Sequence, residues 1–220
     1  MHLTRFEINT ARRAARALMS SPQALHAAVL SGFPPESAAP TDNGRLLWRV
    51  DTHGASTQLF LVSPRPPDLT HLVESVGWPS TQGWDSREYQ PFLDRLQTGG
   101  EWAFRLRANP IRSGRKTHDS PQTQRFGHLT VAQQLAWLTA RAETAGFDIP
   151  EGELGQTQAA VVHREVIRFT RKGSTVTLAT AVYEGRLRVT DPDALRRTLT
   201  HGLGPAKGYG CGLLTLARIS

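Results

Sequence analysis

The chain has 220 residues, 39% of them hydrophobic, and 26 lysines and arginines outnumber 19 aspartates and glutamates to give a formal net charge of +7. This length suits one large domain or two small ones, of which we expect two, and the charge fits a polyanionic partner as well as an ordinary basic globular domain. The single cysteine, Cys211, excludes an internal disulfide and a thiolate zinc site, and the absence of a long apolar run at the N-terminus predicts a cytoplasmic protein without signal peptide or membrane span.

Alternating apolar and polar residues in the first half of the chain predict a β-α-β-β-α-β unit. The expected elements are a strand over 3–8, a helical stretch over 10–19, a short helix over 23–31, paired strands over 45–51 and 57–63, and a helix over 68–76. Ser21 and Pro22 suit the N-cap and first position of the short helix. Glycines and prolines across 77–100 predict an irregular segment with one short strand around 89–93.

The same pattern then repeats in the second half. A strand over 102–108 precedes a basic polar loop over 111–127, a helix over 130–145, a hairpin of strands over 157–171 and 174–190, a helix over 191–200 and a strand over 213–219. Thr130 with Gln133 forms a capping box for the first of these helices. The sequence therefore predicts an α+β chain of two tandem ferredoxin-like, RRM-like β-α-β-β-α-β domains, 1–98 and 99–220.

A glycine-rich loop precedes the last predicted strand. Residues 202–212 contain five glycines, among them Gly204 and Gly208, together with Lys207. Glycines allow positive φ angles and close approach of backbone N–H groups to an anion, and lysine adds a positive charge. Because the loop lacks the Gly-Lys-Ser/Thr ending and following helix of a nucleotide-binding P-loop, it favours the phosphate backbone of a polymer over a mononucleotide.

Several short segments carry a family resemblance when they are taken together. They are His2-Leu3-Thr4-Arg5, Ser21-Pro22-Gln23-Ala24-Leu25-His26, Phe104-Arg105-Leu106-Arg107-Ala108-Asn109-Pro110, Ala136-Trp137-Leu138, Tyr183-Glu184-Gly185-Arg186-Leu187 and Gly204-Pro205-Ala206-Lys207. With these segments the chain resembles the CasE family of CRISPR precursor-RNA endoribonucleases from type I-E systems. The resemblance covers nearly the whole chain. It implies metal-independent cleavage of each precursor RNA repeat at the 3′ base of its hairpin, with no cofactor. It also implies that the chain retains the guide RNA in Cascade, beside backbone, large and small subunits that together bind target DNA.

The implied chemistry is attack of a ribose 2′-OH on the adjacent phosphate, which leaves a 2′,3′-cyclic phosphate and a 5′-OH. The family places its catalytic histidine in the segment that matches residues 21–30, so the resemblance assigns this role to His26, whereas the residues alone fit an ordinary histidine on an apolar helix. Histidine transfers protons near neutral pH. Gln23 stands where family members can have a tyrosine, and it can only hydrogen-bond. Either the role of that tyrosine is positional, or another group such as Tyr209 or Lys207 supplies the acid or base. The sequence leaves open whether His26 acts as acid or base.

Arginines and one lysine are the candidate RNA contacts. They are Arg12, Arg13 and Arg16 on the first helical stretch, Arg105 and Arg107 on one strand, and Arg168, Arg171 and Lys172 at the hairpin tip, in addition to Gly204, Lys207 and Gly208. The helix cluster equally fits a solvated face, and the strand pair fits a cleft between domains or a charged sheet edge.

Alternatives remain at this stage. No histidine or carboxylate spacing predicts a metal site, and the strands lack the aromatic signature with which RRM domains stack bases. A non-catalytic RNA-hairpin scaffold of the same fold stays open because of Gln23. The aromatic residues between 78 and 96 either dock another Cascade subunit or fill the space between the domains.

Overall fold

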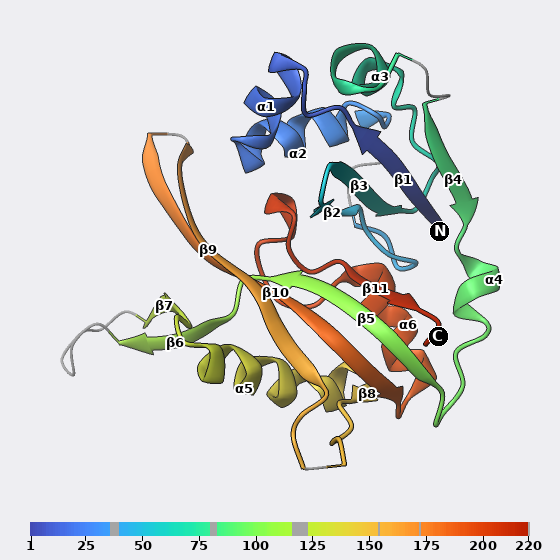
Figure 1. Cartoon of the computed structure of the whole chain (residues 1–220), viewed down its shortest axis with the longest axis vertical. Helices are drawn as coiled ribbons and strands as arrows, with labels where there is room; N and C mark the ends of the chain where they lie inside the picture. Colours follow the sequence, from blue (N-terminus) through green and yellow to red (C-terminus); the bar gives the residue numbers. More distant parts are fainter. Residues whose placement is uncertain (36–39, 80–82, 116–122, 154, 172, 220) are drawn as a thin grey trace.

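The computed structural model describes residues 1–220 except 36–39, 80–82, 116–122, 154, 172 and 220. It contains a four-stranded sheet from the first half of the chain and a five-stranded sheet from the second half. Helices cover the outer side of each sheet, and the two sheets face each other (Figure 1). No described helix is long and apolar enough to cross a membrane.

The first half forms one ferredoxin-like unit. Its elements are β1 (His2–Ile8), α1 (Arg13–Met19), α2 (Pro22–Leu30), β2 (Leu47–His53), β3 (Ser56–Ser63), α3 (Thr70–Val76) and β4 (Trp84–Glu88), followed by the short helix α4 (Gln90–Leu93). The antiparallel strand order β2-β3-β1-β4 places the first and third strands at the centre, as the ferredoxin-like prediction requires.

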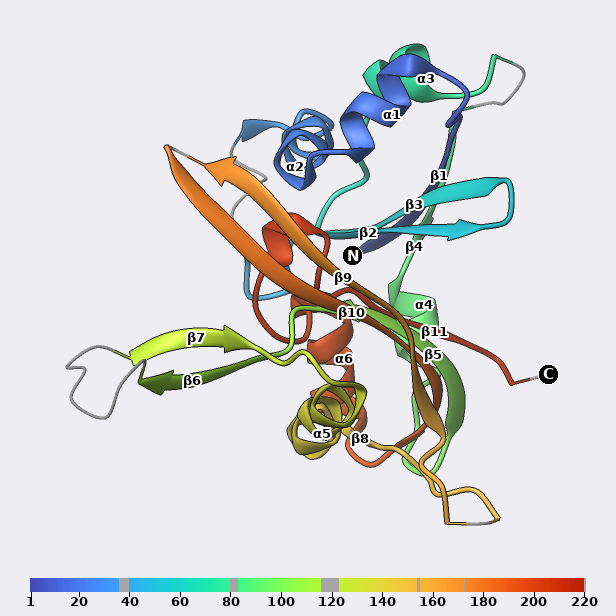
Figure 2. The ribbon, with the colours of Figure 1, turned by 60° about the vertical axis from the view of Figure 1, so that its left-hand side comes forward.

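The second half repeats this topology with additions. It contains β5 (Glu101–Ala108), β6 (Ile111–Arg115), β7 (Thr123–Gly127), α5 (Val131–Ala142), the 3-10 turn η2 (Glu143–Ala145), β8 (Phe147–Asp148), β9 (Ala159–Arg171), β10 (Ser174–Val189), α6 (Pro192–His201), the 3-10 turn η3 (Lys207–Tyr209) and β11 (Leu214–Ala217). The order is β11-β5-β10-β8, and β9 also pairs with β10. The position of the second strand is therefore shared between β8 and the long strand β9, which Figure 2 shows rising with β10 as an extended hairpin.

Two sequence predictions are wrong. The segment expected as a strand around 89–93 forms the helix α4, which has Pro91 in its first turn, and the strand lies just before it as β4. Within the loop expected over 111–127, β6 and β7 pair as antiparallel strands, with Arg112 over the ring of Phe126 at 5.3 Å, and residues 116–122 lie outside the described residues. Its charged residues had concealed the strand pattern.

One of the two hydrophobic clusters in the described residues spans both sheets, and the other lies within the first half. Leu47 and Val62 from the first sheet pack in the same cluster as residues of β5, β10 and β11. Tyr89 belongs to this cluster and Phe92 packs against it, so these two aromatic residues fill the space between the halves, as one of the two interpretations predicted. The division into two domains at residue 98 stays a prediction, because this cluster draws on both halves.

A buried arginine network joins the two halves. Arg49 on β2 is 2% exposed and donates to both carboxylate oxygens of Asp51 at 2.7–3.0 Å. Its guanidinium also donates to the carbonyl oxygens of Arg105 and Leu213 and to the hydroxyl of Thr215, at 2.8–2.9 Å. Since a guanidinium has five N–H donors, these contacts satisfy the whole group and tie β2 to β5 and β11.

We predict that Asp51→Asn lowers the free energy of unfolding by about 3–5 kcal/mol, because it leaves the buried charge of Arg49 without its counterion. Urea denaturation measures this loss. The matched control is Asp148→Asn, since the ion pair of Asp148 with Arg188 is roughly half exposed and its loss should leave unfolding nearly unchanged. Equal effects of both substitutions would show that the Arg49 network does not hold the halves together.

Candidate catalytic and RNA-binding site

The four candidate catalytic residues meet in one pocket. A cavity of about 550 Å³ lies between α2 and the C-terminal glycine-rich loop. Its lining includes Gln23, His26, Arg45, Lys207, Gly208 and Tyr209. Four of these had been selected as catalytic from the sequence, and the fold brings them together from opposite ends of the chain. Their roles stay a prediction.

Helix α2 places His26 in this pocket. The helix begins at Pro22, and the hydroxyl of Ser21 caps it by accepting from the backbone N–H of Ala24 at 3.2 Å. Leu25 and Val29 are buried on the face that packs into the first-half core. Gln23 and His26, three residues apart, therefore share the face that turns to the loop.

The glycine-rich loop approaches α2 and β2 closely at two positions where a Cβ atom would be crowded. A Cβ atom at Gly208 would lie 3.3 Å from Nε2 of His26, which places the loop backbone directly beside the imidazole. Gly210 has a φ of 75°, and a Cβ there would lie 2.6 Å from the indole of Trp48. Ala206 is a non-glycine residue with positive φ, 64°, at the start of η3. The loop thus holds a constrained backbone against the candidate catalytic histidine.

Lys207 and Arg45 place two positive charges in the pocket. The ammonium of Lys207 donates to the carbonyl of Gly204 at 2.5 Å. Burial, and secondly the charge of Arg45, lower the pKa of Lys207 from its ordinary value. Sequence reasoning missed Arg45, because it follows a loop without periodic pattern and meets Lys207 only through the fold.

Trp48 fixes the orientation of the His26 ring. The indole N–H of Trp48 donates to Nδ1 of His26 at 3.3 Å, and the two rings are nearly parallel with centroids 6.5 Å apart. Indole nitrogen is only a donor, so Nδ1 must accept, and the neutral imidazole carries its proton on Nε2. This nitrogen is the ring atom nearest to Gly208. The site therefore presents an N–H toward the loop.

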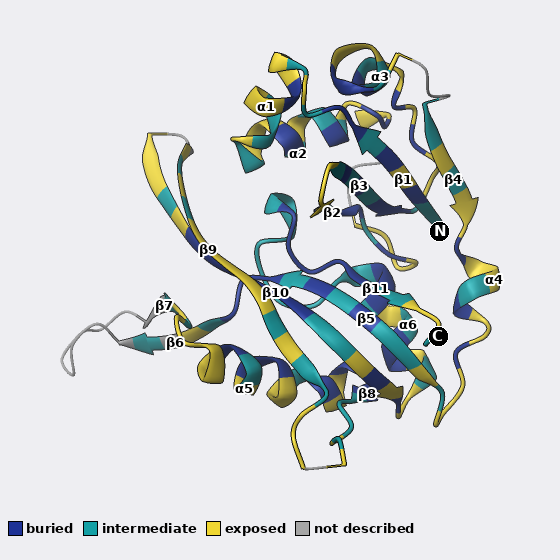
Figure 3. Cartoon of the chain, viewed as in Figure 1, coloured by how far each residue is buried: buried dark blue, intermediate teal, exposed yellow. Residues whose placement is uncertain are grey.

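The β9–β10 hairpin reaches the pocket at its distal end. The ring of Phe169 on β9 contacts that of Tyr209, with centroids 4.8 Å apart. Much of the distal hairpin is exposed (Figure 3), including Arg168. Arg171 ends β9, and Lys172 lies outside the described residues. Phe169 thus brings the described end of β9 beside the pocket, and contact of the basic hairpin tip with RNA stays a prediction.

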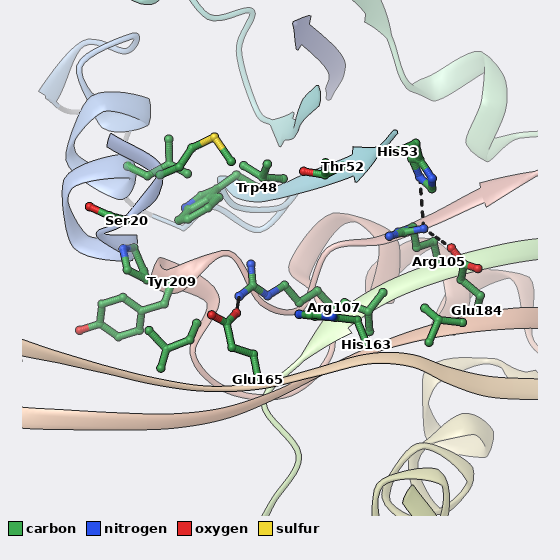
Figure 4. A pocket seen from close by; sticks show the side chains of 17 residues that line it. Ser20, Trp48, Thr52, His53, Arg105, Arg107, His163, Glu165, Glu184 and Tyr209 are labelled. Atoms are coloured by element: carbon green, nitrogen blue, oxygen red, sulfur yellow. Dashed lines mark hydrogen bonds and ion pairs between the residues drawn. The ribbon is translucent and has the colours of Figure 1, made fainter. Parts of the chain in front are cut away.

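Arg105 and Arg107 line a second cavity between the two sheets, with a volume of about 700 Å³. Figure 4 shows both guanidinium groups beside carboxylates: Arg105 with Glu184, and Arg107 with Glu165 at 3.4 Å. Arg105 also contacts Asp51 at 3.1 Å. The interpretation that these residues line a cleft between the halves is confirmed. Contact with RNA stays a prediction, and these carboxylates already offset part of their charge.

The arginines of the first helical stretch do not line the pocket. Arg12 donates to the carbonyl of Glu74 at 2.5 Å, and Arg16 donates to the carbonyls of Thr10 and Ala11. Arg13 and Arg16 are on α1, next to α2. Arg45, and none of these three arginines, is among the residues that line the pocket of His26.

Cys211, to which the sequence assigned no chemistry, is fully buried, and burial raises the pKa of its thiol to about 11.

Within the described part of the chain, no three side chains of His, Cys, Asp or Glu converge in a group that could hold a metal ion. The chemical groups gathered in the pocket are therefore an imidazole, a phenol, an amide and two cations.

Known proteins resemble the chain over its whole length. Residues 1–218 match the family described as CRISPR associated protein. The CRISPR-associated endoribonuclease Cse3 of Thermus thermophilus is 32% identical over 225 residues, which cover 99% of this chain and 100% of that protein. The Cascade subunit CasE of Escherichia coli is 35% identical over 132 residues, or 56% of this chain and 61% of CasE. A structure of Thermus thermophilus Cse3 bound to an RNA representing a pre-cleavage complex has a TM-score of 0.80 and 30% identity, over 99% of this chain and 98% of that one.

We predict that Trp48→Phe releases the tautomer of His26, because phenylalanine preserves a ring but has no N–H to donate. Two-bond ¹H–¹⁵N correlation spectra of the neutral imidazole should show a protonated Nε2 and unprotonated Nδ1 in the wild type, and a mixture in the variant. Trp102→Phe is the control, since Trp102 packs against Phe92 away from the pocket. A protonated Nδ1 in the wild type would contradict the hydrogen-bond assignment.

Proposed function

The chain belongs to the CRISPR-associated protein family that matches residues 1–218, and we propose that it processes precursor CRISPR RNA as an endoribonuclease. It binds the hairpin of each repeat, cleaves at the 3′ base of the stem, and keeps the product as a subunit of Cascade. The observation that carries this proposal is the pocket in which His26 meets Lys207 beside a constrained loop. Relatives named as an endoribonuclease and as a Cascade subunit support it.

The proposed reaction is an internal transesterification. The 2′-oxygen forms a bond to phosphorus, the bond from phosphorus to the 5′-oxygen breaks, and the products are a 2′,3′-cyclic phosphate and a 5′-OH. One group accepts the 2′-OH proton and another donates a proton to the leaving 5′-oxygen. A cation near the phosphate stabilises the charge that accumulates on its oxygens. Since these steps need only an acid, a base and a cation, we propose that cleavage is independent of metal ions.

His26 is the proposed proton donor. Trp48 occupies its Nδ1, which leaves Nε2 as the protonated nitrogen beside the loop. The neutral imidazole donates a hydrogen bond from Nε2 to a phosphoryl oxygen of a bound RNA, and it can protonate the leaving 5′-oxygen once Nδ1 takes up a proton in place of the hydrogen bond from Trp48. Tyr209, which also lines the pocket, is the candidate to accept the 2′-OH proton. Lys207 supplies the positive charge.

RNA recognition is proposed to extend from the pocket along the basic hairpin. Phe169 on Tyr209 fixes the hairpin beside the reacting groups, so a stem that contacts Arg168 also reaches the pocket. A stem is recognised mainly by shape and backbone contacts, which arginines provide without stacked bases. The other Cascade subunits are the proposed protein partners, on the likeness to CasE.

We predict that His26→Ala cleaves a repeat hairpin about 10²–10⁴-fold more slowly while binding it normally, because the variant loses the proton donor but no backbone contact. Single-turnover cleavage in EDTA, with binding measured in parallel, tests this. A hairpin with 2′-deoxyribose at the scissile position should resist the wild type. His201→Ala, on α6 outside the pocket, is the control.

Three results would count against this function. Cleavage that EDTA abolishes contradicts the metal-independent mechanism. Full cleavage by His26→Ala contradicts the role of the histidine. Binding without cleavage by the wild type favours the RNA-binding scaffold, which Gln23 keeps as the second candidate.

We predict that Gln23→Ala slows cleavage by about tenfold, much less than His26→Ala, because an amide can only hydrogen-bond the phosphate or the 2′-OH. Gln23→Tyr, which introduces the residue that relatives can have, should cleave at least as fast as the wild type. Single-turnover rates measure both. A loss with Gln23→Ala as large as that with His26→Ala would show that the amide orders the site in a way that the geometry does not explain.

A further inference from the structure

Arg45 is a buried donor without an acceptor. Its Nε is inaccessible to solvent and, among the residues that the structure describes, has no hydrogen-bond partner. Leaving a buried charged donor unpaired is costly, so the group needs an explanation, and an anion bound beside it is one. Arg45 lies in the lining of the same pocket as His26 and Lys207.

Arg45 and Lys207 are like charges held together. Both are positively charged and line the same pocket, and the pKa of Lys207 is lowered first by burial and secondly by the charge of Arg45. No aspartate or glutamate is among the described residues that line this pocket, in contrast to the cleft where each arginine has a carboxylate. An anion between the two cations would remove the repulsion and supply the acceptor that Nε lacks.

The backbone holds Arg45 in this position independently of its side chain. The N–H of Arg45 donates to the carbonyl of Thr200 at 3.1 Å, at the end of α6 just before the glycine-rich loop. A Cβ at the preceding Gly44, with φ 144°, would lie 3.0 Å from that same carbonyl, so the approach requires glycine. One hydrogen bond thus sets Arg45 relative to the loop that carries Lys207.

We infer that Arg45 binds the scissile phosphodiester, with Lys207 as the second cation, and stabilises the charge that develops during cleavage. A guanidinium donates two parallel hydrogen bonds to phosphate oxygens, which a lysine cannot do. The inference rests on the proposed function, because the scissile phosphate beside His26 exists only if the chain cleaves RNA there.

The first test is the cleavage rate in the bound complex. Arg45→Gln should cleave about 10²–10³-fold more slowly than the wild type, because it removes a donor to the charged transition state. Arg45→Lys should restore part of the rate. Arg87→Gln is the matched control: it removes an arginine that is 81% exposed on β4, and should leave cleavage and binding unchanged. An unchanged rate in Arg45→Gln overturns the inference and leaves the proposed function intact.

A second test does not depend on cleavage. The affinities of wild type and Arg45→Gln are measured for 2′-deoxy hairpins that carry either a phosphodiester or an uncharged methylphosphonate, placed in turn at each linkage at the 3′ base of the stem. If Arg45 contacts the scissile phosphate, the methylphosphonate weakens wild-type binding at one linkage, and this loss shrinks in Arg45→Gln.

Equal losses in both proteins at every linkage would overturn the inference, whether or not the wild type cleaves. Failure of the wild type to cleave would overturn the proposed function, and the affinity cycle would still decide whether Arg45 binds a phosphate. Thermal unfolding of Arg45→Gln should match that of the wild type, because the buried Nε of Arg45 pairs with no described acceptor.

Discussion

The fold depends on the buried guanidinium of Arg49. It lies between the two sheets with all five of its donors used, and its partners come from β2, β5 and β11. Because a buried charge is tolerated only with its partners in place, the two halves can pack in one relative position. That position brings the C-terminal loop against α2 and so assembles a pocket from residues near both ends of the chain.

Strand β2 links this interface to the site through its alternation. Successive side chains on a strand point to opposite faces, so Trp48 and Arg49 have different neighbours. Arg49 reaches the second half, whereas Trp48 packs in the first-half core and donates a hydrogen bond to His26. The indole of Trp48 also leaves no room for a side chain at Gly210. Two consecutive residues therefore set the relation of the halves and the orientation of the imidazole.

Local signals explain which parts of the sequence could be interpreted. The Ser21–Pro22 start and the capping box of Thr130 and Gln133 identified two helices, since each needs only neighbours in sequence. The segment around Tyr89 was misassigned because Tyr89 packs against distant residues of the core, and the strand around Phe126 was missed because charged residues concealed its pattern. His26 was assigned through the family resemblance, whereas Lys207 was singled out by the glycine-rich loop around it. Arg45 has no such motif, and only tertiary contact reveals it.

The two cations of the pocket, which face no carboxylate among its described lining residues, bear on which fragment stays after the cut. In the proposed reaction the negative charge at the scissile position passes entirely to the cyclic phosphate on the hairpin side, and the downstream piece begins with an uncharged hydroxyl. Departure of the hairpin piece would remove the anion that offsets the repulsion between Arg45 and Lys207, whereas departure of the downstream piece leaves that anion in place. The electrostatics of the pocket thus favour one turnover and a guide RNA that remains attached by its new 3′ end.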